Sequence, residues 1–172
     1  DKIVDDGRVP YDDFFIEYPP GALLTFVPPA LLADDRYVPA FKLAMAFCGM
    51  ASLALVAALL VRRRAPGLEL LLGVGIVTLA PVLLGHVYLN RYDPFAALLG
   101  VAALALLLAD RVRLGAAMLA LTFVTKVFTA AALPVVAIRL ARRNGRRALL
   151  VAAGTAAAVV AAAFGPFAAV GA

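Results

Sequence analysis

The sequence predicts an all-α fold, a polytopic integral membrane bundle of about five spans with short re-entrant or interfacial helices. Hydrophobic residues make up 65% of the 172 residues, well above the roughly 45–50% of a soluble domain. They fall in runs of the length, about 20 residues, that crosses a hydrocarbon core of about 30 Å. Short arginine clusters separate several of these runs, as they do in the loops of membrane proteins.

Composition and motifs exclude several other classes. The net charge of +5 comes from arginine runs without interleaved aromatic residues, so we do not expect nucleic acid as a partner. Cys48 is the only cysteine, which rules out an intrachain disulfide and a cysteine-based metal site. No HExxH, Walker or Ser-His-Asp pattern supports a protease or an ATPase.

The first element is an extracytoplasmic acidic loop over residues 1–20, and a transmembrane region over residues 21–172 follows it. An acidic loop lies outside the cell when an earlier membrane segment places it there, so we expect the chain to be a fragment; an N-out start is the alternative. Residues 22–32 are too few to span a membrane, and Pro28-Pro29 should interrupt any helix. We expect an interfacial or re-entrant element there.

Three apolar runs come next, over residues 38–61, 67–89 and 94–109. Because excess Lys and Arg mark the cytoplasmic side, Arg62–Arg64, Arg111 with Arg113, and the arginines of 139–147 should lie inside. Nine of the eleven acidic residues then lie outside. The chain is thus predicted to be a multi-pass protein of the cell membrane with its acidic loop extracytoplasmic.

The run 114–138 should be a broken hairpin. Both of its flanks carry arginines, so it must cross an even number of times, yet 25 residues are too few for two full spans. The break is expected at Thr125-Lys126. The alternative is one tilted span with Lys126 buried. A last outward span is predicted over 148–170.

The acidic loop carries the first candidate chemistry. Asp12, Asp13 and Glu17 stand among aromatic residues, including Tyr11 and Tyr18, beside the membrane surface. Partial burial raises a carboxyl pKa and a nearby cation lowers it, which is how a carboxylate is tuned as a general base. By residue chemistry alone, two interpretations of the loop stay open: a catalytic or metal-binding role, and an ordinary exposed loop.

Charged residues near the membrane supply the other candidates. Arg91 could hold a phosphate with two hydrogen bonds, whereas Asp93 before Pro94 fits a helix N-cap. Lys126 should face a polar cavity or a phosphate, unless it only snorkels at a helix end. His86 is the weakest candidate, because a lone histidine is more often packed or interfacial.

These residues resemble a known family. The block Val9-Pro10-Tyr11-Asp12-Asp13-Phe14-Phe15-Ile16-Glu17-Tyr18-Pro19-Pro20-Gly21, followed by Arg91-Tyr92-Asp93 and by Lys126 before Leu133-Pro134, resembles actinobacterial glycosyltransferases of the GT-C superfamily. The closest likeness is to the glycosyltransferase family 87 group.

The resemblance implies a membrane enzyme that moves mannose or arabinofuranose from a polyprenyl-phosphate donor to a lipid or glycan acceptor of the cell envelope. It makes Asp13 the leading catalytic base, with Asp12 and Glu17 behind it. Arg91 and Lys126 become candidates for the donor phosphate, and Tyr11, Tyr18, Asp93 and His86 for further substrate contacts. No cofactor is certain, and a divalent metal stays possible. A fragment of a membrane transporter and a non-catalytic membrane scaffold are the alternatives.

Overall fold

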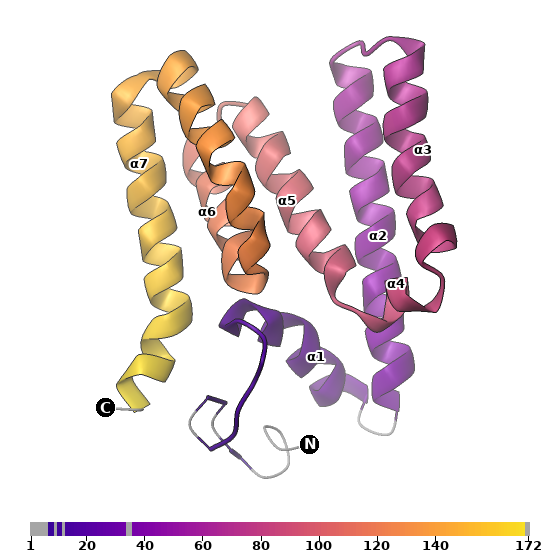
Figure 1. Cartoon of the computed structure of the whole chain (residues 1–172), viewed down its shortest axis with the longest axis vertical. Helices are drawn as coiled ribbons and strands as arrows, with labels where there is room; N and C mark the ends of the chain where they lie inside the picture. Colours follow the sequence, from indigo (N-terminus) through magenta and orange to yellow (C-terminus); the bar gives the residue numbers. More distant parts are fainter. Residues whose placement is uncertain (1–6, 9, 12, 34–35, 171–172) are drawn as a thin grey trace.

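The computed structural model describes residues 7–8, 10–11, 13–33 and 36–170 of the chain. The described residues form helices joined by short turns, with one isolated bridge between Pro10 and Phe14 and no strand among them. Figure 1 shows the long helices side by side, with the N-terminal segment across one end of the bundle. The predicted all-α membrane bundle is confirmed.

The N-terminal segment enters the bundle through a short 3₁₀ helix, η1 (Pro20–Ala22), followed by α1 (Leu23–Ala33). The expectation that Pro28-Pro29 would interrupt this helix is wrong, because both prolines lie inside α1. Each proline removes one hydrogen bond to the carbonyl four residues earlier. The loss is confined to one turn of α1, so the helix continues through it.

The next two helices form a hairpin. α2 (Tyr37–Arg62) and α3 (Gly67–Leu84) pack against each other, and the turn between them holds the first arginine cluster. α3 is shorter than the predicted run 67–89, because Gly85 adopts a positive φ of 54° and ends it. A separate short helix, α4 (His86–Asn90), follows.

The second half of the chain is a folded-back group of helices. α5 (Asp93–Leu108) packs against α2 and α6 (Val112–Thr125), and α6 packs against α7 (Leu133–Val170). Between α6 and α7, Lys126 has an extended backbone and η3 (Val127–Ala132) follows. Figure 1 shows the chain reversing direction there and again within α7, where Gly145 has a φ of 77°.

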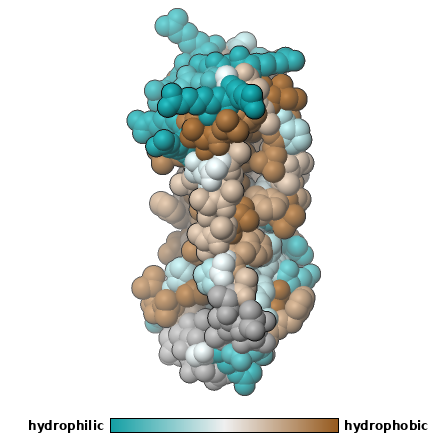
Figure 2. All heavy atoms as spheres, turned by 90° about the vertical axis from the view of Figure 1, so that its left-hand side faces the viewer, coloured by the Kyte–Doolittle hydropathy of each residue, from teal (hydrophilic) through white to brown (hydrophobic). Residues whose placement is uncertain are grey.

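The three reversals that each carry more than one arginine lie at one end of the bundle, here called the arginine end: the α2–α3 turn, the α5–α6 turn and the bend at Gly145 (Figure 1). Figure 2 shows hydrophilic residues gathered at that end above a largely apolar body. η1, α4 and the turn that follows α6 lie toward the other end, here called the loop end.

Among the described residues, three helical segments are long and apolar enough to cross a membrane: Tyr37–Arg62, Gly67–Leu84 and Val127–Ala168. The last contains the bend at Gly145. α5 and α6 are shorter apolar helices. The number of crossings and the side on which each end lies stay predictions.

Two clusters of buried side chains hold the bundle together. At the arginine end, Leu107, Ala116, Leu140 and Ala152 join α5, α6 and α7. At the loop end, a second cluster joins η1, α2 and the start of α5; it consists of Ala22, Phe41, Met45, Cys48 and Tyr92. This second cluster positions the candidate site.

Candidate functional site

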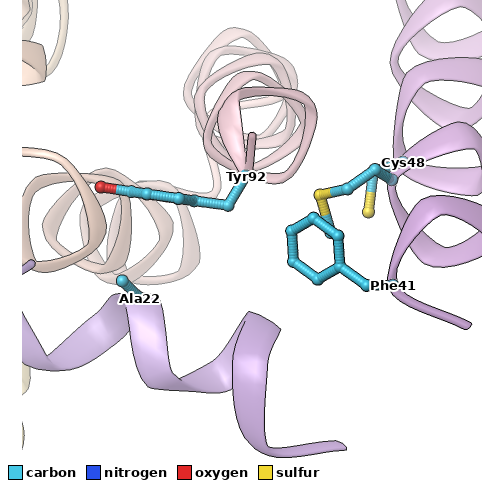
Figure 3. Close-up of a cluster of buried hydrophobic side chains, with 5 residues drawn as sticks. Ala22, Phe41, Cys48 and Tyr92 are labelled. Carbon is cyan, nitrogen blue, oxygen red and sulfur yellow. The ribbon is translucent and has the colours of Figure 1, made fainter. Parts of the chain in front are cut away.

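Tyr92 is the centre of the loop end. It immediately precedes α5 and is only 6% exposed. In Figure 3 its ring lies near Ala22 of η1, and its hydroxyl points away from Phe41 and Cys48 of α2. The residue thus connects three elements that are distant in sequence.

Aromatic contacts fix the acidic loop to Tyr92. The Tyr18 ring meets the Tyr92 ring edge-on with centroids 5.2 Å apart, and Phe26 of α1 meets it at 5.6 Å. Phe26 also stacks on Phe41 of α2 at 5.9 Å. Such pairs are favourable beyond the area they bury, by about 0.5–1.5 kcal/mol. The aromatic residues of the loop and of α1 therefore have a packing role.

Gly21 lets the chain after Tyr18 approach α6 closely. A Cβ atom built on Gly21 would lie 2.7 Å from the Thr125 Oγ1 atom and 2.7 Å from the Val124 carbonyl oxygen. Both residues are buried at the end of α6. Only glycine fits this contact without a shift of backbone. The Pro-Pro-Gly sequence therefore allows the loop to lie in close contact with the end of α6, next to the turn that carries Lys126.

Lys126 and Asp93 form an ion pair at this turn. The Lys126 side chain is 21% exposed and that of Asp93 is 44% exposed. The Lys126 Nζ atom also lies 5.1 Å from the centroid of the Tyr92 ring and 5.3 Å from that of Phe128, within the range of a cation–π interaction. The predicted break after α6 thus places Lys126 against the rings of Tyr92 and Phe128.

The expected N-cap role of Asp93 is wrong. α5 begins at Asp93 itself, and Tyr92 occupies the N-cap position without a side-chain capping hydrogen bond. A carboxylate in the first turn is still favoured by the helix dipole. The Asp93 carboxylate contacts Lys126, and the residue therefore links the α4–α5 turn to the break after α6.

Arg91 and Glu17 act on this group through their charges. Burial, and then the positive charge of Arg91, lowers the pKa of Lys126, while the Asp93 carboxylate favours the ammonium form. Burial is the main cause that raises the pKa of Tyr92, and Glu17 adds to it whereas Arg91 opposes it. Arg91 and Glu17 are both exposed.

The acidic loop folds back on itself before Tyr18. The Tyr11 N–H donates to the Phe14 carbonyl at 3.0 Å, and the Tyr11 hydroxyl donates to the Tyr18 carbonyl at 2.5 Å. The Tyr11 ring meets Phe167 of α7 edge-on at 4.8 Å. Asp13 is exposed within this turn. Asp12 lies outside the described residues.

Not every predicted site residue joins this group. His86 begins α4 and is exposed, and it makes no hydrogen bond or ion pair within the described part of the chain. Over that same part, no group of three or more His, Cys, Asp or Glu residues could hold a metal ion. The described contacts therefore connect Tyr11, Tyr18, Asp93 and Lys126 through Tyr92, without His86. Glu17 and Arg91 act on Tyr92 through their charges.

Sequence reasoning missed two residues of this site. Tyr92 lies in the polar turn between Arg91 and Asp93, where an aromatic residue suggests an interfacial anchor and not a buried residue at the centre of a site. Gly21 ended the Pro-Pro-Gly sequence as an ordinary turn residue. The available signal for Tyr92 was its position between two charged candidates, Arg91 and Asp93.

Comparison with known protein families identifies the family of the chain. The sequence model of glycosyltransferase family 87 matches residues 15–172. No curated protein and no solved structure matches the chain. The matched region contains Glu17, Tyr18, Gly21 and all of the helices, whereas Asp13 precedes it.

Proposed function

Because the chain belongs to glycosyltransferase family 87 and is thus a membrane glycosyltransferase, we propose that it takes a sugar from a polyprenyl-phosphate donor at its loop end. Mannose or arabinofuranose is the sugar, and a lipid or glycan of the cell envelope is the acceptor. The reaction takes place on the extracytoplasmic side. The resemblance of the acidic-loop block supports this choice of donor and sugar.

One observation carries the proposal: Lys126 pairs with Asp93 and lies over the Tyr92 ring, and Arg91 immediately precedes that tyrosine. An ammonium has three hydrogen-bond donors, so Lys126 can bind Asp93 and still donate to a phosphate. Arg91 can hold a phosphate with two parallel hydrogen bonds. These two cations would stabilise the negative charge that develops on the leaving phosphate.

The proposed base is Asp13. In the transfer, an acceptor hydroxyl loses its proton to the Asp13 carboxylate and its oxygen bonds to the anomeric carbon. The bond from that carbon to the donor phosphate breaks, and the phosphate leaves with the electron pair. Because Tyr11 is tied to Tyr18 and Tyr18 packs on Tyr92, the turn that contains Asp13 is connected to the neighbourhood of the cations. Asp12 and Glu17 are the competing carboxylates.

The test is a transfer assay with the full-length protein in membranes, using polyprenyl-phosphate mannose and polyprenyl-phosphate arabinofuranose. We expect Asp13→Asn to lose about 10²–10⁴ in rate, as loss of a positioned base does. Glu69→Gln, an exposed acid in the first turn of α3, is the matched control and should retain activity.

Two further variants make the assignment specific. Collapse of Asp12→Asn or Glu17→Gln with near-normal Asp13→Asn would move the base to that residue. Normal turnover in all three would remove the acidic loop from the chemistry. Transfer from a nucleotide sugar, with none from either lipid donor, would overturn the donor class.

A further inference from the structure

A second charged site lies at the arginine end, at the opposite end of α6 from Lys126. A pocket of about 500 Å³ opens between the first turn of α6 and the start of the α7 limb that follows Gly145. Three of its lining residues are arginines, and they share the pocket with one amide and apolar side chains; those used below are Arg111, Arg113, Asn144, Arg147, Leu114 and Val151.

The arginines of this pocket lack acidic partners. The nearby acid, Asp110, accepts hydrogen bonds from the Arg143 Nη2 atom at 3.0 Å and the Asn144 Nδ2 atom at 3.3 Å. No acidic side chain pairs with Arg111, Arg113 or Arg147 over the residues that the structure describes. The Asp110 contacts therefore join the α5–α6 turn to the bend in α7 and leave the positive charge of the pocket uncompensated.

Backbone donors add to this charge. The N-cap of α6, Arg111, makes no side-chain capping hydrogen bond, so the first N–H groups of that helix have no helical acceptor. The limb of α7 after Gly145 also begins at the pocket, and glycine has no side chain to cap it. The N-terminus of a helix favours an anion. Here the two N-termini lie beside three guanidinium groups.

The wall of the pocket that leads toward the body of the bundle is apolar. Val151 and Leu114 line it, and Leu114 is 51% exposed on the outside of the bundle. Figure 2 shows the hydrophilic residues of this end directly above the apolar surface of the helices. A ligand here would meet cations at its head and an apolar surface below it.

We propose that this pocket binds the headgroup of an anionic phospholipid. The phosphate meets Arg111, Arg113 and Arg147, and the acyl chains continue along Leu114 and Val151. Basic pockets between membrane helices bind lipid headgroups in this way. The site is separate from the proposed transfer site and does not depend on it.

The test is native mass spectrometry of the full-length protein in detergent, titrated with phosphatidylglycerol or with phosphatidylcholine of the same acyl chains. We expect tighter binding of phosphatidylglycerol, because choline offsets the phosphate charge of the other lipid. The triple variant Arg111→Gln, Arg113→Gln, Arg147→Gln should lose at least about tenfold in phosphatidylglycerol affinity.

The matched control is Arg62→Gln, Arg63→Gln, Arg64→Gln, which removes the same charge from the α2–α3 turn outside the pocket. Its affinity should stay within about twofold of the unmodified protein, since the interactions of the pocket remain. Equal losses in the two triple variants would show a diffuse charge effect and overturn the site, as would equal binding of the two lipids.

Two additions complete the experiment. The first is inorganic phosphate at 10 mM, on the order of a hundredfold excess over the lipid. Phosphatidylglycerol should stay bound, because inorganic phosphate has no acyl chains to contact the apolar wall. Displacement of the lipid would overturn the lipid assignment. If the pocket triple variant is not helical by circular dichroism, the single variants Arg113→Gln and Arg147→Gln replace it. Each is expected to weaken binding by about threefold, and no loss in either would overturn the site.

Discussion

Lys126 owes its position to the residues around it. Thr125 ends α6 with its hydroxyl bonded to the Leu121 carbonyl at 2.7 Å, and the extended backbone of Lys126 then turns its side chain toward Asp93 and the Tyr92 ring. A charged side chain beside membrane helices is costly unless it is paired. The ion pair and the two aromatic rings supply that pairing while leaving the Lys126 side chain 21% exposed.

We predict that Lys126→Met lowers kcat/KM for transfer from a polyprenyl-phosphate sugar by about 10²-fold, because it removes one cation from the leaving phosphate. Lys42→Met is the control, since Lys42 lies on α2 and forms no ion pair over the described residues. Steady-state transfer rates at equal expression decide the matter. Equal effects in the two variants would contradict a specific role for Lys126.

A second prediction concerns pH. Burial and Arg91 lower the pKa of Lys126, so its ammonium is lost at a lower pH than the roughly 10.4 of an ordinary lysine. The rate of a transfer that requires this charge should therefore begin to fall at a pH below the pKa of an ordinary lysine. Arginine stays protonated throughout, so Lys126→Arg should move this fall to higher pH. A pH profile of kcat/KM that is the same for both proteins would argue against Lys126 as the titrating group.

At the scale of elements, the apolar runs predicted helices because a backbone in a membrane must satisfy its hydrogen bonds within the segment. The ends of the helices were harder to predict. α3 ends at Leu84 and not at Leu89 because the next residue, Gly85, adopts a positive φ, and nothing in the run itself requires that conformation. Pro28 and Pro29 lie within α1, although a proline normally ends a helix.

The contact of η1 with α6 gives the third prediction. A methyl group on Gly21 would collide with the Val124 carbonyl, a backbone atom that cannot rotate away. Gly21→Ala should therefore cost about 1–3 kcal/mol, as overpacking does, and should reduce transfer because Tyr18 is displaced from Tyr92. The measurements are thermal unfolding in detergent and the transfer assay.

Gly75→Ala is the matched control for Gly21→Ala. Gly75 lies inside α3, and a Cβ atom built on it would have no other atom of its surroundings within 4 Å. Alanine there should therefore be neutral or stabilising by up to about 1 kcal/mol. A Gly21→Ala protein as stable and active as Gly75→Ala would show that the close approach to α6 is dispensable.

At the scale of the whole molecule, the sequence identified the charged candidates but not what joins them. Arg91, Asp93 and Lys126 were noticeable because charges near a membrane are rare. Their common neighbour, Tyr92, depends on contacts among η1, α1, α2 and α5, and no local pattern encodes pairings over such separations. The opposite end was more predictable, because arginine clusters mark turns on one side of a membrane.

The last prediction is the orientation of the bundle. Because the three reversals that each carry more than one arginine lie at one end (Figure 1), residues 113 and 144 should be labelled from the cytoplasm. Phe15, which is 88% exposed in the acidic loop, should be labelled from outside. The experiment replaces Cys48 with alanine, introduces single cysteines at Arg63, Arg113, Asn144 or Phe15, and applies a membrane-impermeant thiol reagent to intact and to opened cells. Arg63→Cys is the cytoplasmic reference. Labelling of positions 113 and 144 from opposite sides would mean that α6 and the first limb of α7 cross the membrane once as a single tilted span, and it would place Lys126 inside that span and away from the extracytoplasmic site.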